Sequence, residues 1–504
     1  MLSPITRAGS VNVEANGDDF WSRHNLAALW SIVAVGALLR LVALGHKGFW
    51  LDEIASVSIA QRPSAAFWRF LWHDEGNMAL YYVLLRPWLH FGHGEAMVRL
   101  LSVLPGVLAI PLMYGLARRL FGLPAGILAA ALLALNPCAI ASSQEARAYS
   151  FLVLGVIGSA YLFVRLIEAP SYRFAFAYAI VAGLTCYFHY FGVLVPATHA
   201  IALMVVPRSS RRWRPYLAAA AIFVLLAIPV LWLMHAQDIG HISWVQPPSL
   251  LELYHLGVFL AASGGKAVGA VLLALDLTLI GFFLTRMRET FRAASPVSSA
   301  KGLPLAGTDS IGWHYALVAS SVFSPIVIAL VVSTVTPVFY HRYLVICLPG
   351  FVLMTAVGAL QIPHRQWRTS AIAGVCGLSL VSTVILYKRV TEDWRGAVGY
   401  LIATAHPEDR LLCYQPVGSF AVENYLAWLP GGRGVQLPVA VADPAKTNWE
   451  QQLHRAPRVW LVLYRAKVDG SDSRIIEQEL LKSYNAGVPK VFRGIAVLEY
   501  DAKR

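Results

Sequence analysis

Two pairs of neighbouring acidic residues lie in one stretch near the N-terminus. Asp52 and Glu53 form the first pair, and Asp74 and Glu75 form the second. Brought together in one folded loop, such carboxylates would bracket a substrate hydroxyl, and one of them would accept its proton as a general base. Asp52 and Glu53 are therefore the catalytic candidates. Asp52, Glu53 and Asp74 are also candidate oxygen ligands for a divalent metal, which is the one cofactor that this pattern suggests.

A simpler interpretation of both pairs stays open. The apolar positions within residues 51–60 repeat at helical spacing, which favours an amphipathic helix lying along a membrane surface. Asp52 would then cap this helix, and Glu53 would interact favourably with the dipole at its N-terminus. Asp74 and Glu75 would belong to a solvated turn.

Further polar and aromatic residues stand at the ends of apolar runs. A charge at the centre of a bilayer is costly, so these residues should pair, reach the interface or face a polar cavity. An arginine at the mouth of an apolar bundle suits a lipid phosphate, which it engages through paired hydrogen bonds. Snorkelling of Arg147 and interfacial anchoring of His189 are the alternatives. The substrate-binding candidates of this kind are Glu145, Arg147, Tyr149, His189, Arg342 and Tyr343.

The elements that must position these residues are membrane spans. The chain has 504 residues, of which 57% are hydrophobic and only 14% are charged, and its mean hydropathy is +0.57. Apolar runs long enough to cross about 30 Å of hydrocarbon predict about eleven spans. The runs cover residues 26–45, 96–117, 122–141, 149–167, 173–188, 191–206, 217–235, 266–285, 313–335, 343–361 and 369–387.

The placement of positive charge predicts how these spans are oriented. The net charge of +13 does not indicate a nucleic-acid partner, because arginines cluster in alternate short loops, as at Arg118, Arg119, Arg365 and Arg368. Such loops face the cytoplasm. With the N-terminus inside, an odd number of spans places the acidic loop and the C-terminal region on the extracytoplasmic face.

Three regions follow from this pattern. Residues 1–25 are expected to be a disordered cytoplasmic N-terminus. Residues 26–390 form the all-α polytopic membrane bundle, with a long first outer loop at 45–78. Residues 391–504 alternate helix-like and strand-like pieces, which indicates a small soluble α/β domain.

The chain resembles the polyprenyl-phosphate-sugar-dependent glycosyltransferases of the GT-C fold, which include protein O-mannosyltransferases and the transferases that decorate lipid A. The resemblance covers most of the bundle. It rests on the order and shared face of five motifs, at residues 48–53, 80–85, 145–149, 189–191 and 342–344.

The resemblance implies a function and a set of residue roles. The chain would move a sugar from a polyprenyl-phosphate donor to a glycan, lipid or protein acceptor, with inversion, on the outer face of a bacterial cytoplasmic membrane. Asp52 matches the loop acid of the family, and Tyr81 and Tyr82 join the substrate-binding candidates. Many relatives carry His-Pro-Pro or Lys-Pro-Pro where this chain has residues 77–79, so His73 or Arg86 would have to replace a lysine contact.

Two other functional classes remain as alternatives. A transporter or flippase for lipid-linked sugars would carry charges near the middle of its spans and broken or repeated helices. A polysaccharide polymerase or ligase would place its main polar loop later in the bundle. The early acidic loop favours the transferase.

Overall fold

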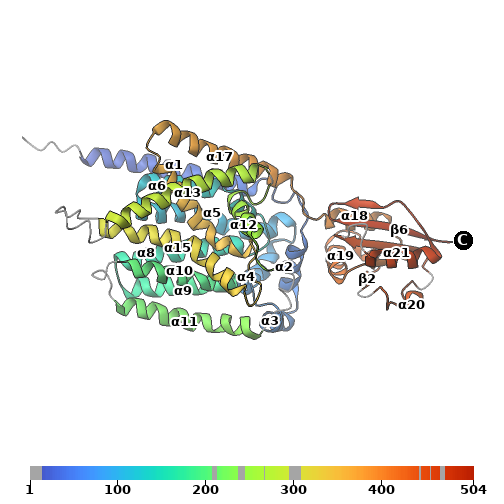
Figure 1. Cartoon of the computed structure of the whole chain (residues 1–504). Coiled ribbons are helices and arrows are strands. Elements are labelled where there is room, and N and C mark those ends of the chain that lie inside the picture. The colour runs from blue at the N-terminus through green and yellow to red at the C-terminus, as the bar shows by residue number, and fades with distance from the viewer. Residues whose placement is uncertain are drawn as a thin grey trace, which may run out of the picture.

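The computed structural model describes residues 14–206, 213–236, 245–265, 267–293, 308–441, 444–453, 456–465 and 471–503. A bundle of long helices forms one body and a mixed sheet with flanking helices forms a second body at one end of it (Figure 1). The all-α bundle and the small α/β domain are therefore both confirmed.

Eight helical segments of the described chain are long and apolar enough to cross a membrane, which confirms a multi-pass membrane protein. One bent helix pair raises this number to nine, and the shorter apolar helices α9 (Tyr172–Phe188), α10 (Leu194–Val205) and α12 (Leu250–Ala262) accompany them. The predicted count of about eleven is not confirmed, because the runs at 173–188 and 191–206 form helices too short to pass this criterion. The eight segments are α1 (Glu14–Leu41), α5 (Glu95–Phe121), α8 (Tyr149–Glu168), α11 (Trp213–Ala236), α13 (Ala267–Ala293), α15 (Thr308–Val332), η5 with α16 (Tyr343–Cys347 and Leu348–Leu360) and α17 (Arg365–Lys388).

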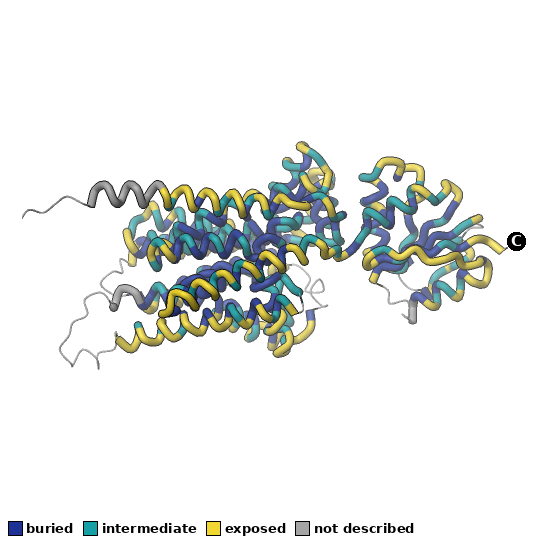
Figure 2. Tube along the Cα trace, turned by 90° about the horizontal axis from the view of Figure 1, so that it is seen from above, coloured by how far each residue is buried: buried dark blue, intermediate teal, exposed yellow. Residues whose placement is uncertain are grey.

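Packing divides these helices into inner and outer ones. Every residue of α16 from Leu348 to Ala359 is buried, and a Cβ at Gly358 would lie 1.9 Å from the carbonyl oxygen of Leu279, so only glycine lets α13 approach so closely. In contrast, α11 exposes apolar side chains such as Leu217 (64%) and Leu225 (67%). Figure 2 shows this exposed outer surface along the bundle, which is the surface that would face lipid.

The bent pair lies just before one of the candidate motifs. α6 (Leu123–Leu135) and α7 (Pro137–Ser143) meet at 58°, because Pro137 cannot continue the hydrogen bonding of α6 and Asn136 caps α7 by accepting from the N–H of Ala139. The buried Arg40 donates to the carbonyl oxygens of Leu133 and Ala134 at 3.2 and 3.0 Å. Arg40 thus provides hydrogen bonds for carbonyl oxygens at the end of α6. The chain continues from α7 into residues 144–148.

Residues 51–91, which include most of the loop predicted at 45–78, fold into short helices across one end of the bundle. α2 (Leu51–Gln61), α3 (Ser64–His73), α4 (Ala79–Trp88) and η1 (Leu89–Phe91) lie between the spans and the C-terminal domain (Figure 1). The helix predicted for residues 51–60 is confirmed as α2. Its buried face includes Ile54 and Val57.

The C-terminal domain holds a six-stranded sheet in the order β2-β1-β3-β6-β4, with β5 paired to β6. β1 pairs in parallel with β2 and β3, whereas β6 is antiparallel to β3, β4 and β5. The central strand β3 is buried along almost its whole length, as its apolar sequence requires. The elements are α18 (Trp394–Thr404), β1 (Arg410–Cys413), α19 (Pro416–Trp428), η6 (Gly432–Gly434), β2 (Val439–Ala440), α20 (Trp449–Leu453), β3 (Arg458–Tyr464), α21 (Ser471–Ser483), β4 (Tyr484–Ala486), β5 (Lys490–Phe492) and β6 (Ile495–Ala502).

The domain is hydrogen-bonded to the bundle beside α2. The hydroxyl of Tyr425 accepts from the N–H of Phe49 at 2.6 Å, and Arg395 donates to the carbonyl oxygen of His46 at 2.6 Å. At the other end of the chain, residues 1–13 lie outside the described residues, and α1 begins at Glu14, within the segment for which disorder was expected. Helix α1 therefore starts earlier than its apolar run.

Candidate active site

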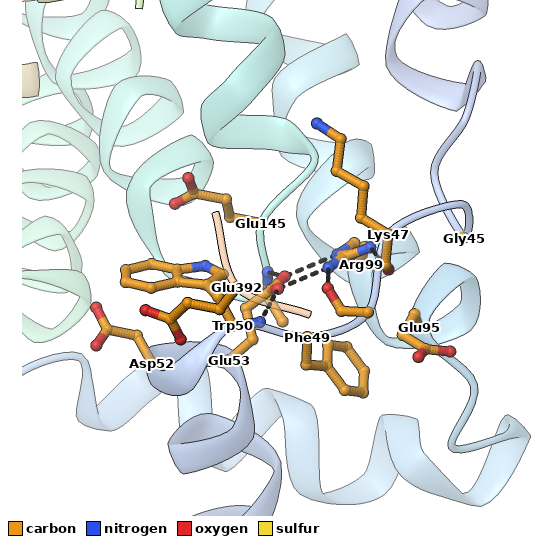
Figure 3. A network of polar contacts seen from close by, with 12 residues as sticks. Gly45, Lys47, Phe49, Trp50, Asp52, Glu53, Glu95, Arg99, Glu145 and Glu392 are labelled. Atoms are coloured by element: carbon orange, nitrogen blue, oxygen red, sulfur yellow. Dashed lines mark hydrogen bonds and ion pairs between the residues drawn. The ribbon is translucent and has the colours of Figure 1, made fainter. Parts of the chain in front are cut away.

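Glu53 lies in the first turn of α2 with its carboxylate fully buried at the centre of a polar network (Figure 3). Arg99 on α5 donates to both carboxylate oxygens, at 2.7 Å from Nε and 2.6 Å from Nη2. The backbone N–H groups of Trp50 and Ala146 donate to the same carboxylate at 3.3 and 2.8 Å. Four donors leave this carboxylate little capacity to act as a base, so the geometry favours a positioning role over the catalytic role that the sequence suggested.

Arg99 extends this network into the loop before α2. Its guanidinium donates to the carbonyl oxygens of Leu44, Lys47 and Gly48 at 2.8 to 2.9 Å. Sequence reasoning missed Arg99, although an arginine in an apolar run is a signal of a buried partner. Arg99 and Glu53 together fix the loop, α2 and the backbone at Ala146.

Asp52 is the neighbour of Glu53 but faces another way. Successive residues of a helix point about 100° apart, and Figure 3 shows Asp52 pointing away from the Arg99–Glu53 pair. Its side chain is 40% exposed, and its Oδ2 lies 3.9 Å from Nη2 of Arg147. Asp52 is therefore an accessible carboxylate on a rigidly held helix.

Arg147 faces Asp52 with unused hydrogen-bonding capacity. Its Nη1 lies 3.4 Å from the hydroxyl of Ser56 and 3.5 Å from that of Tyr82, both longer than the usual N–H···O distance of about 2.9 Å. Its Nε is buried and has no hydrogen-bond partner among the described residues. A guanidinium held this loosely can receive an anionic ligand.

Glu145 and Arg342 form an ion pair on the same side of the site. The guanidinium of Arg342 also lies over the rings of Trp50 and Tyr149, at 4.7 and 5.3 Å from their centroids. Burial raises the pKa of Glu145, while the neighbouring Arg342 opposes that rise. The pair joins the loop after α7 to the segment before η5, so two distant motifs meet here.

Aromatic side chains form one wall of the site. The ring of His189 lies 5.9 Å from that of Tyr149 and 5.2 Å from that of Tyr343. Its Nδ1 accepts from the N–H of Phe191, so its proton resides on Nε2, which has no partner among the described residues. Burial, with a smaller contribution from Arg147, lowers the pKa of His189 to about 3. The ring is therefore neutral and offers one free donor.

Tyr81 and Tyr82 continue this wall from α4. Both are buried, and their ring centroids lie 6.1 Å apart. Tyr82 reaches Arg147 through its hydroxyl, whereas Tyr81 packs against Phe151 of α8. The family resemblance made both tyrosines substrate-binding candidates, and the structure places the hydroxyl of Tyr82 beside Arg147.

The second acidic pair lies at the edge of the site. Glu75 is half-buried, and its charge acts on Tyr82 and Arg147. Asp74 is exposed at the end of α3 and forms no ion pair with any described residue. Of the candidate replacements for a lysine, Arg86 donates to backbone carbonyls and His73 is exposed at the end of α3.

The proposed metal ligands do not gather. Glu53 is bound to Arg99, while Asp52 lies in α2 and Asp74 directly follows α3. Across the described part of the chain, no group of three or more histidine, cysteine, aspartate or glutamate side chains is placed to hold a metal ion. The residues therefore do not fit the divalent metal that the acidic pairs suggested.

Glu392, which sequence reasoning missed, ties the C-terminal domain to α2. Its buried carboxylate accepts from the N–H of Leu51 at 3.0 Å and from the indole N–H of Trp394 at 2.9 Å. The other oxygen accepts from the Tyr464 hydroxyl at 2.7 Å and from Arg465 at 3.0 Å. Leu51 precedes Asp52, so a carboxylate from the far end of the chain caps the helix that carries the candidate base.

The chain is similar to a known protein family and to several solved structures. A family model described as dolichyl-phosphate-mannose-protein mannosyltransferase matches residues 82–233. ArnT from Cupriavidus metallidurans in the apo state superposes with a TM-score of 0.60 and 14% identity, over 93% of this chain and 97% of that one. This chain has the GT-C fold. The same ArnT bound to undecaprenyl phosphate gives a TM-score of 0.56 and 13% identity over the same shares of the two chains.

A third GT-C structure agrees. The archaeal oligosaccharyltransferase AglB from Archaeoglobus fulgidus, in complex with an inhibitory peptide and a dolichol-phosphate, matches with a TM-score of 0.52 and 11% identity, over 96% of this chain and 75% of that one. No curated protein sequence matches significantly. The GT-C fold and the family model support the transferase hypothesis over the alternative of a transporter or flippase.

Proposed function

We propose that this protein transfers a sugar from a polyprenyl-phosphate donor to an acceptor hydroxyl, with inversion at the anomeric carbon. One observation carries the proposal. An accessible carboxylate, Asp52, lies 3.9 Å from the under-satisfied guanidinium of Arg147, at the mouth of an apolar bundle. A base beside an anion-binding cation is what displacement of a phosphate leaving group by a hydroxyl requires.

The reaction is a single displacement. Asp52 takes the proton of the acceptor hydroxyl while that oxygen attacks the anomeric carbon. The bond from this carbon to the phosphate oxygen breaks on the opposite face, and the phosphate keeps the electron pair. Arg147 donates its free N–H groups to the developing negative charge, and Arg342 supports it from the Glu145 pair.

The surrounding residues bind and orient the substrates. Tyr149, His189 and Tyr343 give the sugar an aromatic wall with one free N–H donor on Nε2 of His189. Glu53 and Arg99 hold α2 in place. The apolar surface of the spans below suits the polyprenyl chain, and the acceptor is a glycan, a lipid or a protein.

We also propose that the site faces outward from a bacterial cytoplasmic membrane. Arg119 and Glu168, paired at 2.7 Å, lie at the ends of α5 and α8 that are remote from the site, where basic residues gather. A reporter that is active only outside the cytoplasm, fused to the C-terminus, should therefore be active. Activity of a cytoplasmic reporter at the same position would contradict this orientation.

The decisive experiment uses Asp52→Asn with Asp74→Asn as its matched control, because both are acids of the same loop. The purified chain in nanodiscs is incubated with a native membrane lipid extract, and release of polyprenyl phosphate is followed by mass spectrometry. We expect Asp52→Asn to lower release by about 10²–10⁴-fold, the usual contribution of a general base. Asp74→Asn should stay close to the unmodified protein.

Wild-type turnover by a folded Asp52→Asn protein would remove the catalytic assignment. The sugar and acceptor are then identified from cell-envelope glycans and glycoproteins of cells with and without the protein. A single missing sugar unit is the expected difference.

A further inference from the structure

A cavity lies beside the site and shares the Glu145–Arg342 pair with it. It has a volume of about 150 Å³ and is bounded by the loop before α2, the end of α12 and the end of α17. This volume corresponds to about five water molecules at liquid density, which is enough for a phosphate group with its five heavy atoms. The charged residues that line it are Lys47, Glu53, Arg99, Glu145, Arg342, Arg389 and Glu392.

The cavity is lined by more positive than negative side chains. Each of its three carboxylates has its own arginine, because Glu53 pairs with Arg99, Glu145 with Arg342, and Glu392 with Arg465, which is not itself a lining residue. Two cations are left over. Neither Lys47 nor Arg389 forms an ion pair with any residue that the structure describes.

Both surplus cations also have unused donors. Lys47 donates one hydrogen bond, from Nζ to the carbonyl oxygen of Leu386 at 2.7 Å, and Figure 3 shows its ammonium pointing away from the Arg99–Glu53 pair. Arg389 makes one long contact, 3.4 Å from Nη1 to the carbonyl oxygen of Ser263. Burial, and then the charges of Arg99 and Arg389, lower the pKa of Lys47 to about 8. An anion between the two side chains would relieve this repulsion.

We infer that the cavity between Lys47 and Arg389 binds a phosphate group, as a site separate from the donor phosphate position at Arg147. Two adjacent cations match a doubly charged tetrahedral anion better than a carboxylate. The cavity lies at the end of the bundle that joins the C-terminal domain, which is the end that lipid headgroups and phosphorylated substrates would both reach in the proposed orientation. The assignment does not require that the chain transfers sugar, so it can be tested without an activity assay.

The test follows chemical modification of Lys47 in the full chain. In phosphatidylcholine nanodiscs at pH 8, part of Lys47 is neutral and reacts with an amine reagent, and peptide mass spectrometry measures the extent. Inorganic phosphate at ten times its dissociation constant should slow this reaction about tenfold at constant ionic strength, since only about one site in ten remains empty. Lys490, exposed on β5, should react at an unchanged rate.

Two variants and a second lipid sharpen the result. Arg389→Gln should abolish the protection of Lys47, whereas Arg368→Gln, at the opposite end of α17, should preserve it. Protection in nanodiscs that contain phosphatidic acid, whose headgroup is a phosphomonoester, without added phosphate would assign the site to a lipid headgroup. Protection only on adding phosphate would assign it to a substrate phosphate. Equal modification of Lys47 under all these conditions, or undiminished protection in Arg389→Gln, would overturn the inference.

Discussion

Glu53 and Arg99 form a buried ion pair, with Oε2 of the glutamate 2.6 Å from Nη2 of the arginine, on the helix turn that also presents Asp52. Adjacent acids therefore have opposite environments. One is enclosed and neutralised by a cation, and the other is accessible. We therefore expect substitution of Glu53 to affect mainly the stability of the protein, and substitution of Asp52 to affect mainly its activity.

Glu53→Gln should destabilise the protein. Removing one partner leaves Arg99 charged in a buried position, which costs about 3–5 kcal/mol. Thermal unfolding of the protein in detergent should show a clear fall in Tm. Glu168→Gln breaks the half-exposed pair with Arg119 and should cost only about 0–1 kcal/mol. Equal melting temperatures for the two variants would contradict the role of Glu53 as a buried anchor.

Glu392→Gln should lower kcat with little change in the donor KM. The substitution weakens the cap on the N–H of Leu51 and loses a charge-assisted hydrogen bond worth about 1.5–3 kcal/mol, so α2 is held less firmly. Glu499→Gln is the matched control, because Glu499 pairs with Arg458 within the C-terminal domain. If both variants affect kcat alike, the coupling between Glu392 and the site does not exist.

Arg147→Lys should impair use of the donor more than Arg342→Ala does. Arg147 has a buried Nε without a described partner, whereas the charge of Arg342 is shared with Glu145. We expect kcat/KM for the donor to fall by about ten- to a hundredfold in Arg147→Lys, as loss of a charged hydrogen bond of about 1.5–3 kcal/mol implies. Steady-state kinetics at varied donor concentration measure this. A larger loss in Arg342→Ala would move the phosphate to that arginine.

His189 should make the folded state sensitive to acid. Its pKa is lowered to about 3 in the fold, so below the unfolded value of about 6.5 only the unfolded chain gains the proton. Stability from this group is present above about pH 6.5 and declines by about 1.4 kcal/mol per unit as the pH falls toward 3. Between pH 7.5 and 5.5, Tm should therefore fall further in the wild type than in His189→Asn. Parallel declines would show that His189 is not buried as a neutral ring.

Much of this fold could be predicted because each membrane span is encoded by a continuous run of apolar residues. Runs of apolar residues specify helices such as α5 and α8, and the helical spacing at 51–60 specified α2. The span count stays open because a proline at residue 137 bends one run and others form short helices. The local sequence pattern does not show where a helix bends or where it ends.

The site was predictable only in part. Arg147, His189 and Arg342 stand out as polar residues at the ends of spans. Arg99 and Glu392 do not, because their partners lie 46 and 341 residues away in the chain. Likewise, the sequence named both Asp52 and Glu53 as catalytic candidates, and only the ion pair between Glu53 of α2 and Arg99 of α5 separates their roles.

The contact between Glu392 and Leu51 also orders the assembly of the protein in time. Helix α2 is among the first segments to leave the ribosome, and the Glu53–Arg99 pair can form soon afterwards. The cap from Glu392, with Tyr464 and Arg465 behind it, cannot form until the last part of the chain has been synthesised and folded. A chain still being made, or one truncated before its final domain, therefore lacks the fully fixed helix that carries Asp52.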